Sequence, residues 1–424
     1  MERPLTGLMR GDGVALSLTE YRDGGGYSAL EKALKSWSGE DVIEEVKASN
    51  LRGRGGAGFP AGLKWSFVPR TDKAPRPRYL VANADEMEPG AFKDRLLLEG
   101  NPHLLLEGMI LSAYAMGAEV AYIFLRGEYV EPRRRLRRAI DEASAAGLLG
   151  RNILGTDFSL DLYLHISAGR YICGEETGLL NALEGKRATP RSKPPFPQVS
   201  GAWGKPTVVN NVETLCNVPG IVRHGAEWYR GLGLAEDSGT KLFGVSGRVR
   251  QPGAWELPMG TTLRNILEKH AGGMCDGYHL KGVLPGGGST DFLLPEHLDM
   301  AMDYDTVGKA GSRLGTGTLI VLDDKTCPVG MVLNLERFFA QESCGWCTPC
   351  RDGLPWTRQL LEDIEDGRGS LEDLSTLEDH TAFMGPGKTV CALAPGAMEP
   401  LQSALKFYRE DFEQHIREGR CPYD

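Results

Sequence analysis

Short and long apolar stretches alternate along the chain between residues 78 and 167. The longer stretches have the length and pattern of helices and occupy 102–118 and 131–147. The short stretches predict buried strands at 78–84, 119–127 and 159–167. Regular alternation of strands and helices predicts βα units around a largely parallel sheet. The proline-rich stretch 190–206 that follows predicts little regular structure.

The apolar pattern changes near residue 239. Two strand-like runs, 240–249 and 253–258, meet across a turn and precede a helix that Thr261 is placed to cap. This order of elements predicts a small α+β module. Beyond Cys327 the apolar spacing becomes helical and predicts a bundle, with helices at 329–343, 354–366, 370–384 and 396–418.

Composition narrows the class of protein. The 424 residues are enough for two or three domains, and 41% hydrophobic and 25% charged residues are ordinary for a globular protein. A net charge of −9 argues against a nucleic-acid partner. The longest apolar segment, 103–125, is interrupted by Glu107 and Glu119, so we expect no transmembrane helix. The N-terminus lacks the apolar core of a secretory signal, and nine cysteines, an odd number, favour a reducing compartment.

Three cysteines, Cys344, Cys347 and Cys350, lie two residues apart in the sequence ESCGWCTPCRDG. This compact spacing, completed by a remote fourth cysteine, is typical of a four-iron cluster. Cys391, in a loop rich in glycine and proline, is a better fourth ligand than Cys421, which lies near the C-terminus where chains are often poorly ordered. A redox pair and a structural zinc site are the alternatives. The remaining thiols are scattered and are expected to be packing residues: Cys173, Cys216, Cys275, Cys327 and Cys421.

A glycine-rich loop in LRGRGGAGFPAGLKW is the first candidate binding element. Its spacing matches a dinucleotide fingerprint, but the preceding segment 38–50 reads as a helix rather than a strand. Glycines still permit a flat ligand to approach closely, and the neighbouring side chains offer positive charge and stacking faces. A flexible surface loop is the alternative. The candidate residues are Gly53, Arg54, Gly55, Gly56, Gly58, Phe59, Lys64 and Phe67.

Polar residues gather where predicted strands end, which is where parallel α/β sheets bind ligands. Turn formation and helix capping could also explain the polar residues after the first strand, 83–88. The sequence shows no nucleophile with a base partner, so bound cofactors are expected to carry the chemistry. The candidates are Asn83, Asp85, Glu86 and Glu88, then Gly174, Glu175 and Glu176, then Asn210, Asn211 and Thr214.

Taken together, five motifs resemble the flavin-containing NADH-binding subunit of bacterial respiratory complex I, the proton-pumping NADH:quinone oxidoreductase. They are LRGRGGAGFPAGLKW, NADEMEPGAFKDR, GRYICGEETGLLNALEGKRA, GKPTVVNNVETLCN and ESCGWCTPCRDG with Cys391. The resemblance implies a Rossmann-like α/β domain for FMN and NADH, a ubiquitin-like β-grasp module and a helical bundle carrying a 4Fe-4S cluster. The predicted boundaries are an N-terminal extension at 1–27, then domains at 28–238, 239–327 and 328–424.

The resemblance also implies a role for particular residues. Two departures from the expected motif, Gly178 for alanine and Ser167 for glycine, are small and are expected to adjust packing only. The implied NADH contacts are Phe59, Phe67, Glu88, Glu176, Lys193 and Phe196. The implied FMN contacts are Gly53, Arg54, Gly55, Lys64, Asn83, Asp85, Glu86, Tyr171, Gly174, Glu175, Asn210, Asn211 and Thr214.

The implied activity is hydride transfer from NADH to FMN, followed by single-electron transfer to the cluster and on toward quinone. The implied partners are a thioredoxin-like 2Fe-2S subunit and a large multi-cluster subunit, with the membrane arm reached indirectly. The implied location is peripheral, on the cytoplasmic side of the inner membrane. Two alternatives are the diaphorase subunit of an NAD-reducing hydrogenase or formate dehydrogenase, and a cluster-bearing scaffold that merely binds a nucleotide.

Overall fold

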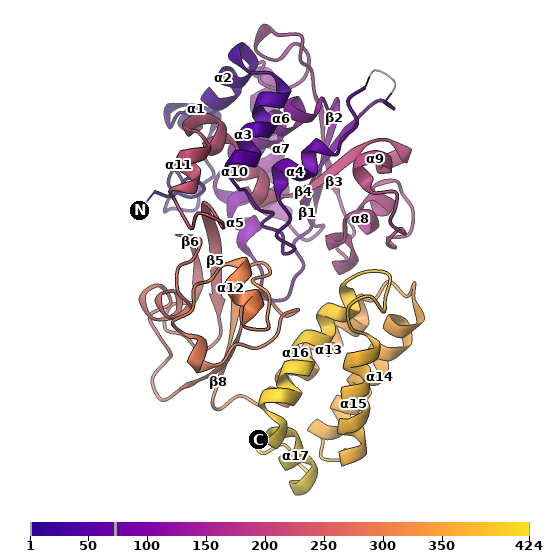
Figure 1. Ribbon diagram of the computed structural model, residues 1–424. Helices are drawn as coiled ribbons and strands as arrows, with labels where there is room; N and C mark the ends of the chain where they lie inside the picture. Colours follow the sequence, from indigo (N-terminus) through magenta and orange to yellow (C-terminus); the bar gives the residue numbers. More distant parts are fainter. Residues whose placement is uncertain (1, 72–73, 424) are drawn as a thin grey trace.

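A parallel sheet forms the centre of the first of three bodies in the computed structural model, which describes residues 2–71 and 74–423 (Figure 1). The strand order is β3-β2-β1-β4, and every neighbouring pair is parallel. Three of the strands confirm the predicted ones, whereas the fourth lies just beyond the stretch in which we expected little regular structure. The strands are β1 (Tyr79–Ala84), β2 (Val120–Leu125), β3 (Asp161–Ile166) and β4 (Thr207–Asn211).

Helices surround this sheet and bury one another. The predicted helix at 102–118 is α6 (Pro102–Met116), which is buried along nearly its whole length and packs on α10 (Val212–His224). This burial explains its continuous apolar character, and no helix of the described residues is long and apolar enough to cross a membrane. The other helices of this body are α1 (Leu18–Asp23), α2 (Ser28–Ser36), α3 (Gly39–Ala48), α4 (Ala61–Ser66), α5 (Lys93–Gly100), α7 (Val130–Ala145), α8 (Glu176–Leu183), α9 (Pro197–Ser200) and α11 (Ala226–Arg230).

The second body is a mixed four-stranded sheet with the order β6-β5-β8-β7. Its first and last strands, β5 (Thr240–Ser246) and β8 (Thr318–Asp323), run parallel at the centre, as in a β-grasp fold. The outer strands β6 (Gly253–Pro258) and β7 (Leu280–Leu284) pair antiparallel to them, and α12 (Tyr304–Lys309) lies nearby.

The helix predicted after β6 differs from expectation. It is a π-helical segment, Asn265–His270, and the side chain of Thr261 bonds to the Pro258 carbonyl instead of capping it. The hydroxyl of Thr262 accepts the Asn265 N–H in its place. Adjacent threonines cannot be told apart by pattern alone, because only backbone direction decides which hydroxyl meets the first free N–H.

The third body is the helical bundle, drawn in orange and yellow in Figure 1. The predicted helix at 396–418 is two helices, α16 (Leu393–Phe407) and α17 (Arg409–Glu418), because Tyr408 leaves the helical conformation. The second predicted helix begins earlier than expected, so Cys350 lies in its first turn. The other helices are α13 (Pro328–Glu342), α14 (Thr348–Glu365) and α15 (Leu371–Phe383).

Gly108 sets the distance between α6 and α10. A Cβ at Gly108 would lie 2.1 Å from the backbone oxygen of Leu215, so Gly108→Ala must push the helices apart. We expect it to lower the free energy of unfolding by about 1–3 kcal/mol, seen as a lower denaturation midpoint. Gly308→Ala is the matched control, because a Cβ there has no described atom within 4 Å. Equal midpoints for the two variants would contradict this packing.

Candidate functional site

One cavity of about 1020 Å³ lies where the three bodies meet, at the carboxyl ends of β1 and β4. Parallel sheets leave such a crevice because their connections depart to either side. The glycine loop, the segment before α8 and loops of the second sheet line it, and Cys391 stands in its wall. It is lined by every predicted cofactor residue except Arg54, namely Gly53, Gly55, Gly56, Gly58, Phe59, Lys64, Phe67, Asn83, Asp85, Glu86, Glu88, Tyr171, Gly174, Glu175, Glu176, Lys193, Phe196, Asn210, Asn211 and Thr214.

The glycine loop is held in a folded-back conformation at the cavity edge. The N–H of Gly53 donates to the Phe59 carbonyl at 2.9 Å, which closes the loop on itself. A Cβ at Gly55 would lie 3.0 Å from Cβ of Asn211, so a side chain there would displace the neighbouring cavity wall. Gly56 has φ +135°, which L side chains rarely adopt. The loop therefore keeps its backbone exposed to the cavity because its residues are glycines.

Arg54 lies behind the cavity wall rather than in it. Its side chain is fully buried, and its guanidinium donates to the Ser238 carbonyl at 2.7 Å and to the Tyr229 hydroxyl at 3.2 Å. Its backbone N–H donates to the Thr214 hydroxyl at 2.8 Å. The Arg54 side chain therefore anchors the glycine loop to α11 and to the segment just before β5.

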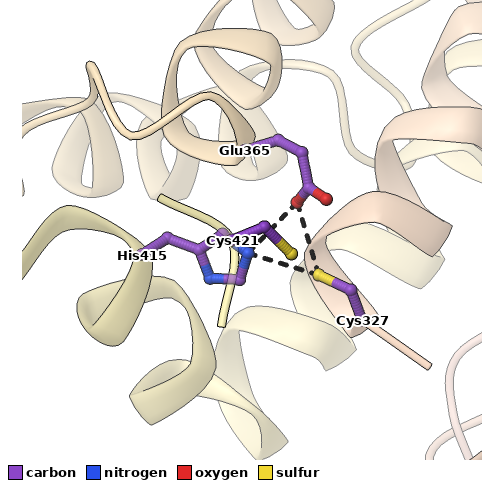
Figure 2. A group of neighbouring side chains, drawn as sticks. All are labelled: Cys327, Glu365, His415 and Cys421. Carbon is purple, nitrogen blue, oxygen red and sulfur yellow. Dashed lines mark hydrogen bonds and ion pairs between the residues drawn. The ribbon is translucent and has the colours of Figure 1, made fainter. Parts of the chain in front are cut away.

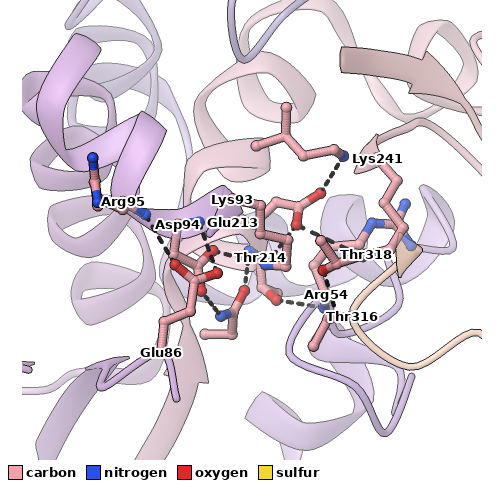
Figure 3. Close-up of polar contacts among 12 residues, drawn as sticks. Arg54, Glu86, Lys93, Asp94, Arg95, Glu213, Thr214, Lys241, Thr316 and Thr318 are labelled. Atoms are coloured by element: carbon pink, nitrogen blue, oxygen red, sulfur yellow. Dashed lines mark hydrogen bonds and ion pairs between the residues drawn. The ribbon is translucent and has the colours of Figure 1, made fainter. Parts of the chain in front are cut away.

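A network of buried charges, drawn in Figure 3, includes Lys93 and Asp94 of the cavity lining. The ammonium of Lys93 is 2.7 Å from both Asp94 and Glu213, and all three side chains are almost fully buried. The amide of Asn211 donates to Asp94 at 2.5 Å. Glu86 accepts the backbone N–H of Asp94, and burial together with the nearby Asp94 charge raises the pKa of Glu86. The cavity floor thus has a fixed pattern of charge.

Asp85 presents an unused acceptor. Its Oδ2 accepts the Ser167 hydroxyl at 2.9 Å, whereas its buried Oδ1 has no hydrogen-bond partner among the described residues. Burial raises its pKa to about 6, and the Ser167 hydrogen bond opposes that rise. A buried acceptor without a partner is costly, so a ligand N–H would complete it. Ser167, expected only to adjust packing, therefore orients a cavity carboxylate.

Four charged side chains form a compact group at the other side of the cavity. Lys64 is 2.7 Å from Glu176, and Lys193 is 3.0 Å from Glu176 and 3.1 Å from Glu175. Burial raises the pKa of Glu176, but the two lysines outweigh it, so the pKa falls below its usual value. Glu176 is therefore a carboxylate at neutral pH. Its flanking lysines offset much of its charge.

Three aromatic side chains stand exposed at the cavity mouth. Phe59, Phe67 and Phe196 are 48%, 51% and 54% exposed, and the rings of Phe59 and Phe67 are 6.4 Å apart. Large apolar side chains are normally exposed singly. Their gathering at one rim suits stacking against a planar ring.

Sequence reasoning missed the wall contributed by the second sheet. Ser289 and Arg313 line the cavity, and the N–H of Ser289 donates to Glu88 at 2.8 Å. The Tyr171 hydroxyl donates to the same carboxylate at 2.7 Å. The only signal for this wall was PGGGST at 285–290, a glycine cluster far from the other motifs, which pattern alone does not connect to them.

Three of the predicted cluster ligands, Cys344, Cys347 and Cys391, lie on loops at one end of the bundle, and Cys350 lies in the first turn of α14. Burial, with the nearby thiols Cys347, Cys391 and Cys344 adding to it, raises the pKa of Cys350 to about 12. No three of these four sulfurs all lie within 4.8 Å of one another. A single zinc ion would hold thiolates about 3.8 Å apart. The wider arrangement fits a four-iron cluster, whose thiolates bind separate irons.

The chain matches three known protein families along its length. Residues 46–220 match the Nuo51 FMN-binding domain, residues 241–308 the SLBB domain, and residues 330–415 the NADH-ubiquinone oxidoreductase-F iron-sulfur binding region. Cavity, cysteine loops and family matches together define a class, the flavin- and iron–sulfur-containing oxidoreductase subunits.

Curated relatives place the chain within that class. The F subunit of the NADH-quinone oxidoreductase of Escherichia coli (strain K12) is 59% identical over 415 residues, covering 98% of this chain and 93% of that protein. An F subunit of the NADH-quinone oxidoreductase of Rhizobium meliloti (strain 1021) is 52% identical, covering 96% of each chain. The chain belongs to the family of NADH-quinone oxidoreductase F subunits, and its cofactors are FMN and a 4Fe-4S cluster. A solved NAD⁺-reducing nickel–iron hydrogenase in its air-oxidized state is also similar, with TM-score 0.83, 36% identity, and coverage of 95% of this chain and 67% of that one.

A side chain at Gly55 should prevent flavin retention. Gly55→Val would crowd Asn211, which itself holds Asp94, so the cavity floor would shift. We expect the purified variant to hold less than about a tenth of an FMN molecule per chain. The binding free energy of FMN should fall by at least about 1.4 kcal/mol. Gly11→Val is the control, because a Cβ there meets no described atom within 4 Å. FMN near one per chain in the Gly55 variant would refute the close approach.

Loss of Cys391 should degrade the cluster without releasing the flavin. The remote thiolate completes the ligand set begun by Cys344, so Cys391→Ala should remove most of the cluster's EPR signal and iron. FMN should stay bound, because most of its predicted contacts lie in the first body. Cys275→Ala, at a half-buried thiol of the second body, serves as the control. An intact four-iron EPR signal in the Cys391 variant would show that the fourth ligand is elsewhere.

Proposed function

We propose that this chain is the NADH-oxidising subunit of a proton-pumping NADH:quinone oxidoreductase. The observation that carries the proposal is the single cavity that gathers the predicted flavin and nucleotide residues and reaches Cys391 in its wall. The predicted nucleotide site therefore adjoins a predicted ligand of the 4Fe-4S cluster within one chain.

Bound FMN supplies hydride acceptance from NADH, and the 4Fe-4S cluster supplies one-electron transfer. The protein's contribution is to position both. The glycine loop allows backbone contact with a flat ligand, and Oδ1 of Asp85 accepts a ring N–H. Asn210 and Asn83 are themselves fixed, since Asn210 accepts from the Trp65 indole at 2.9 Å and Asn83 donates to the Cys173 carbonyl at 3.0 Å. Such side chains lose little freedom when the ligand binds.

Nucleotide binding is assigned to the cavity mouth. The rings of Phe59, Phe67 and Phe196 stack with the adenine and exclude water from it. Glu176 accepts hydrogen bonds from the adenosine ribose, the usual role of an acidic residue in NAD sites.

Partners are expected where the cysteine loops meet solvent. Trp346 stands between Cys344 and Cys347 and is 60% exposed, and Phe383 at the end of α15 and Val390 beside Cys391 are exposed as well. Exposed aromatic residues are enriched in protein interfaces, so Trp346 beside the predicted cluster ligands suits a partner that accepts electrons from the cluster. A thioredoxin-like 2Fe-2S subunit and a large multi-cluster subunit are the proposed partners. They carry electrons toward a membrane arm, with this chain on the cytoplasmic side of the inner membrane.

The rival assignment is the diaphorase subunit of a hydrogenase. The structural likeness to the hydrogenase is close, but identity to the quinone oxidoreductase subunits reaches 59% against 36%. Absorption and EPR spectra of the purified chain before and after NADH test the activity: bleaching of the flavin and a new cluster signal are expected. Colourless protein without NADH:ferricyanide activity would refute it, and co-purification with a nickel-containing subunit would favour the rival.

Glu176 should make the enzyme prefer NADH to NADPH. A carboxylate that accepts a ribose hydroxyl contributes about 1.5–3 kcal/mol, or about ten- to a hundredfold in affinity, and repels a 2′-phosphate. Glu176→Gln removes that acceptor strength and also leaves Lys64 and Lys193 without their shared anion. The kcat/KM ratio of NADH to NADPH, with ferricyanide as acceptor, should therefore fall about tenfold or more.

The control for this change is Glu227→Gln, which alters an exposed carboxylate on α11. It should leave the ratio unchanged. A Glu176 variant with the wild-type ratio would show that another residue selects the nucleotide.

A further inference from the structure

Four side chains with metal-binding atoms converge at the far end of the helical bundle (Figure 2). Cys327 stands at the start of α13, Glu365 at the end of α14, His415 near the end of α17, and Cys421 three residues after α17 ends. Their donor atoms all lie within 4.8 Å of one another. His415 and Cys421 are buried. No sequence pattern connects these thiols, which we expected to be separate packing residues.

The donor spacings match a tetrahedral ion. Sγ of Cys327 is 3.3 Å from both Nε2 of His415 and an oxygen of Glu365, and that nitrogen and oxygen are 3.2 Å apart. Zinc bonds of about 2.0–2.3 Å at tetrahedral angles separate such donors by about 3.3–3.8 Å. Two sulfurs, one imidazole and one carboxylate are all ordinary zinc ligands.

Surrounding groups orient the donors as around a metal. Nδ1 of His415 is 2.6 Å from the Asp411 carbonyl, so it carries a proton and turns Nε2 toward Cys327 and Glu365. A metal-bound histidine is nearly always held this way. Cys327 is the N-cap of α13, where its sulfur accepts the Gly330 N–H at 3.2 Å. Burial and the neighbouring Glu365 raise the pKa of this thiol despite that hydrogen bond, so an ion bound here displaces its proton.

Close backbone packing brings the four elements together. A Cβ at Gly330 would lie 2.8 Å from a Glu365 oxygen, so glycine leaves room for that carboxylate. A Cβ at Gly367 would lie 2.0 Å from the backbone of Gly419, so the turns that end α14 and α17 touch directly. Only glycine at position 367 permits this contact, which places Glu365 beside Cys421.

We propose that Cys327, Glu365, His415 and Cys421 bind one zinc ion that fastens the C-terminal segment to the bundle. The set is closed, with four protein ligands, as in structural rather than catalytic zinc sites. It is separate from the iron–sulfur loops, because α13 spans about 22 Å between Cys327 and its other end, next to Cys344. Without an ion the group is held by hydrogen bonds, since the Cys327 thiol donates to Glu365 at 3.3 Å and a protonated His415 pairs with the same carboxylate at 3.2 Å, so metal analysis distinguishes the two states.

Metal analysis of the holoprotein tests the proposal. We expect one zinc per four irons in the purified wild-type chain. The double variant Cys327→Ser/Cys421→Ser should lower zinc at least tenfold while iron and FMN stay at wild-type levels. Cys275→Ser is the matched control and should keep zinc. Zinc X-ray absorption, which the irons do not affect, should show two sulfurs at about 2.3 Å and two lighter ligands at about 2.0 Å.

Chelation provides a measurement that does not depend on the variants folding. Removing zinc from the wild-type holoprotein should make cleavage after residue 408 by a protease at least tenfold faster, with iron retained. Wild-type protein without zinc would overturn the proposal, as would a disulfide between Cys327 and Cys421 found by mass spectrometry under non-reducing conditions. Zinc retained at wild-type level by the double variant would also overturn it.

Discussion

The buried ammonium of Lys93 between Asp94 and Glu213 is the interaction on which the site depends. Glu213 also accepts the N–H of Leu242 in the second sheet, and Asp94 holds Asn211 at the cavity floor. One buried charge group thus connects the first body, the second body and the ligand cavity. Breaking such a pair leaves an uncompensated buried charge and costs about 3–5 kcal/mol. The group is therefore a structural requirement that fixes the cavity floor.

A second constraint is the meeting of three bodies at one cavity. The first supplies the glycine loop and strand ends, the second supplies Ser289 and Arg313, and the bundle supplies Cys391. Electron transfer benefits when donor and acceptor share one rigid environment. A site assembled this way needs the bodies in a fixed relation, and the hydrogen bonds of Tyr304 to Gly53 and of Ser289 to Glu88 across the junction maintain it.

The two ends of the helical bundle carry different groups of metal-binding side chains. At one end the cysteine loops face the cavity and solvent, and at the other the C-terminal segment returns to the start of α13. A cluster is held at a defined position only when the residues around its ligands are themselves fixed. An ion that fastens the tail would contribute to the same rigidity.

Sequence by itself determined the local elements and much of the site. Apolar alternation predicted three of the parallel strands, and the short thiol spacing predicted a cluster, because both depend on neighbouring residues. The glycine loop and the acidic strand ends were likewise visible as motifs, and nearly all of them line the cavity. The tertiary structure decided what depends on distant residues. It buried Arg54, directed Ser167 at Asp85, added the wall from the second sheet and joined Cys327 to Cys421 across 94 residues. The local sequence pattern predicts the conformation of a residue. Which side chain it contacts depends on how helices and sheets that are far apart in the sequence pack together.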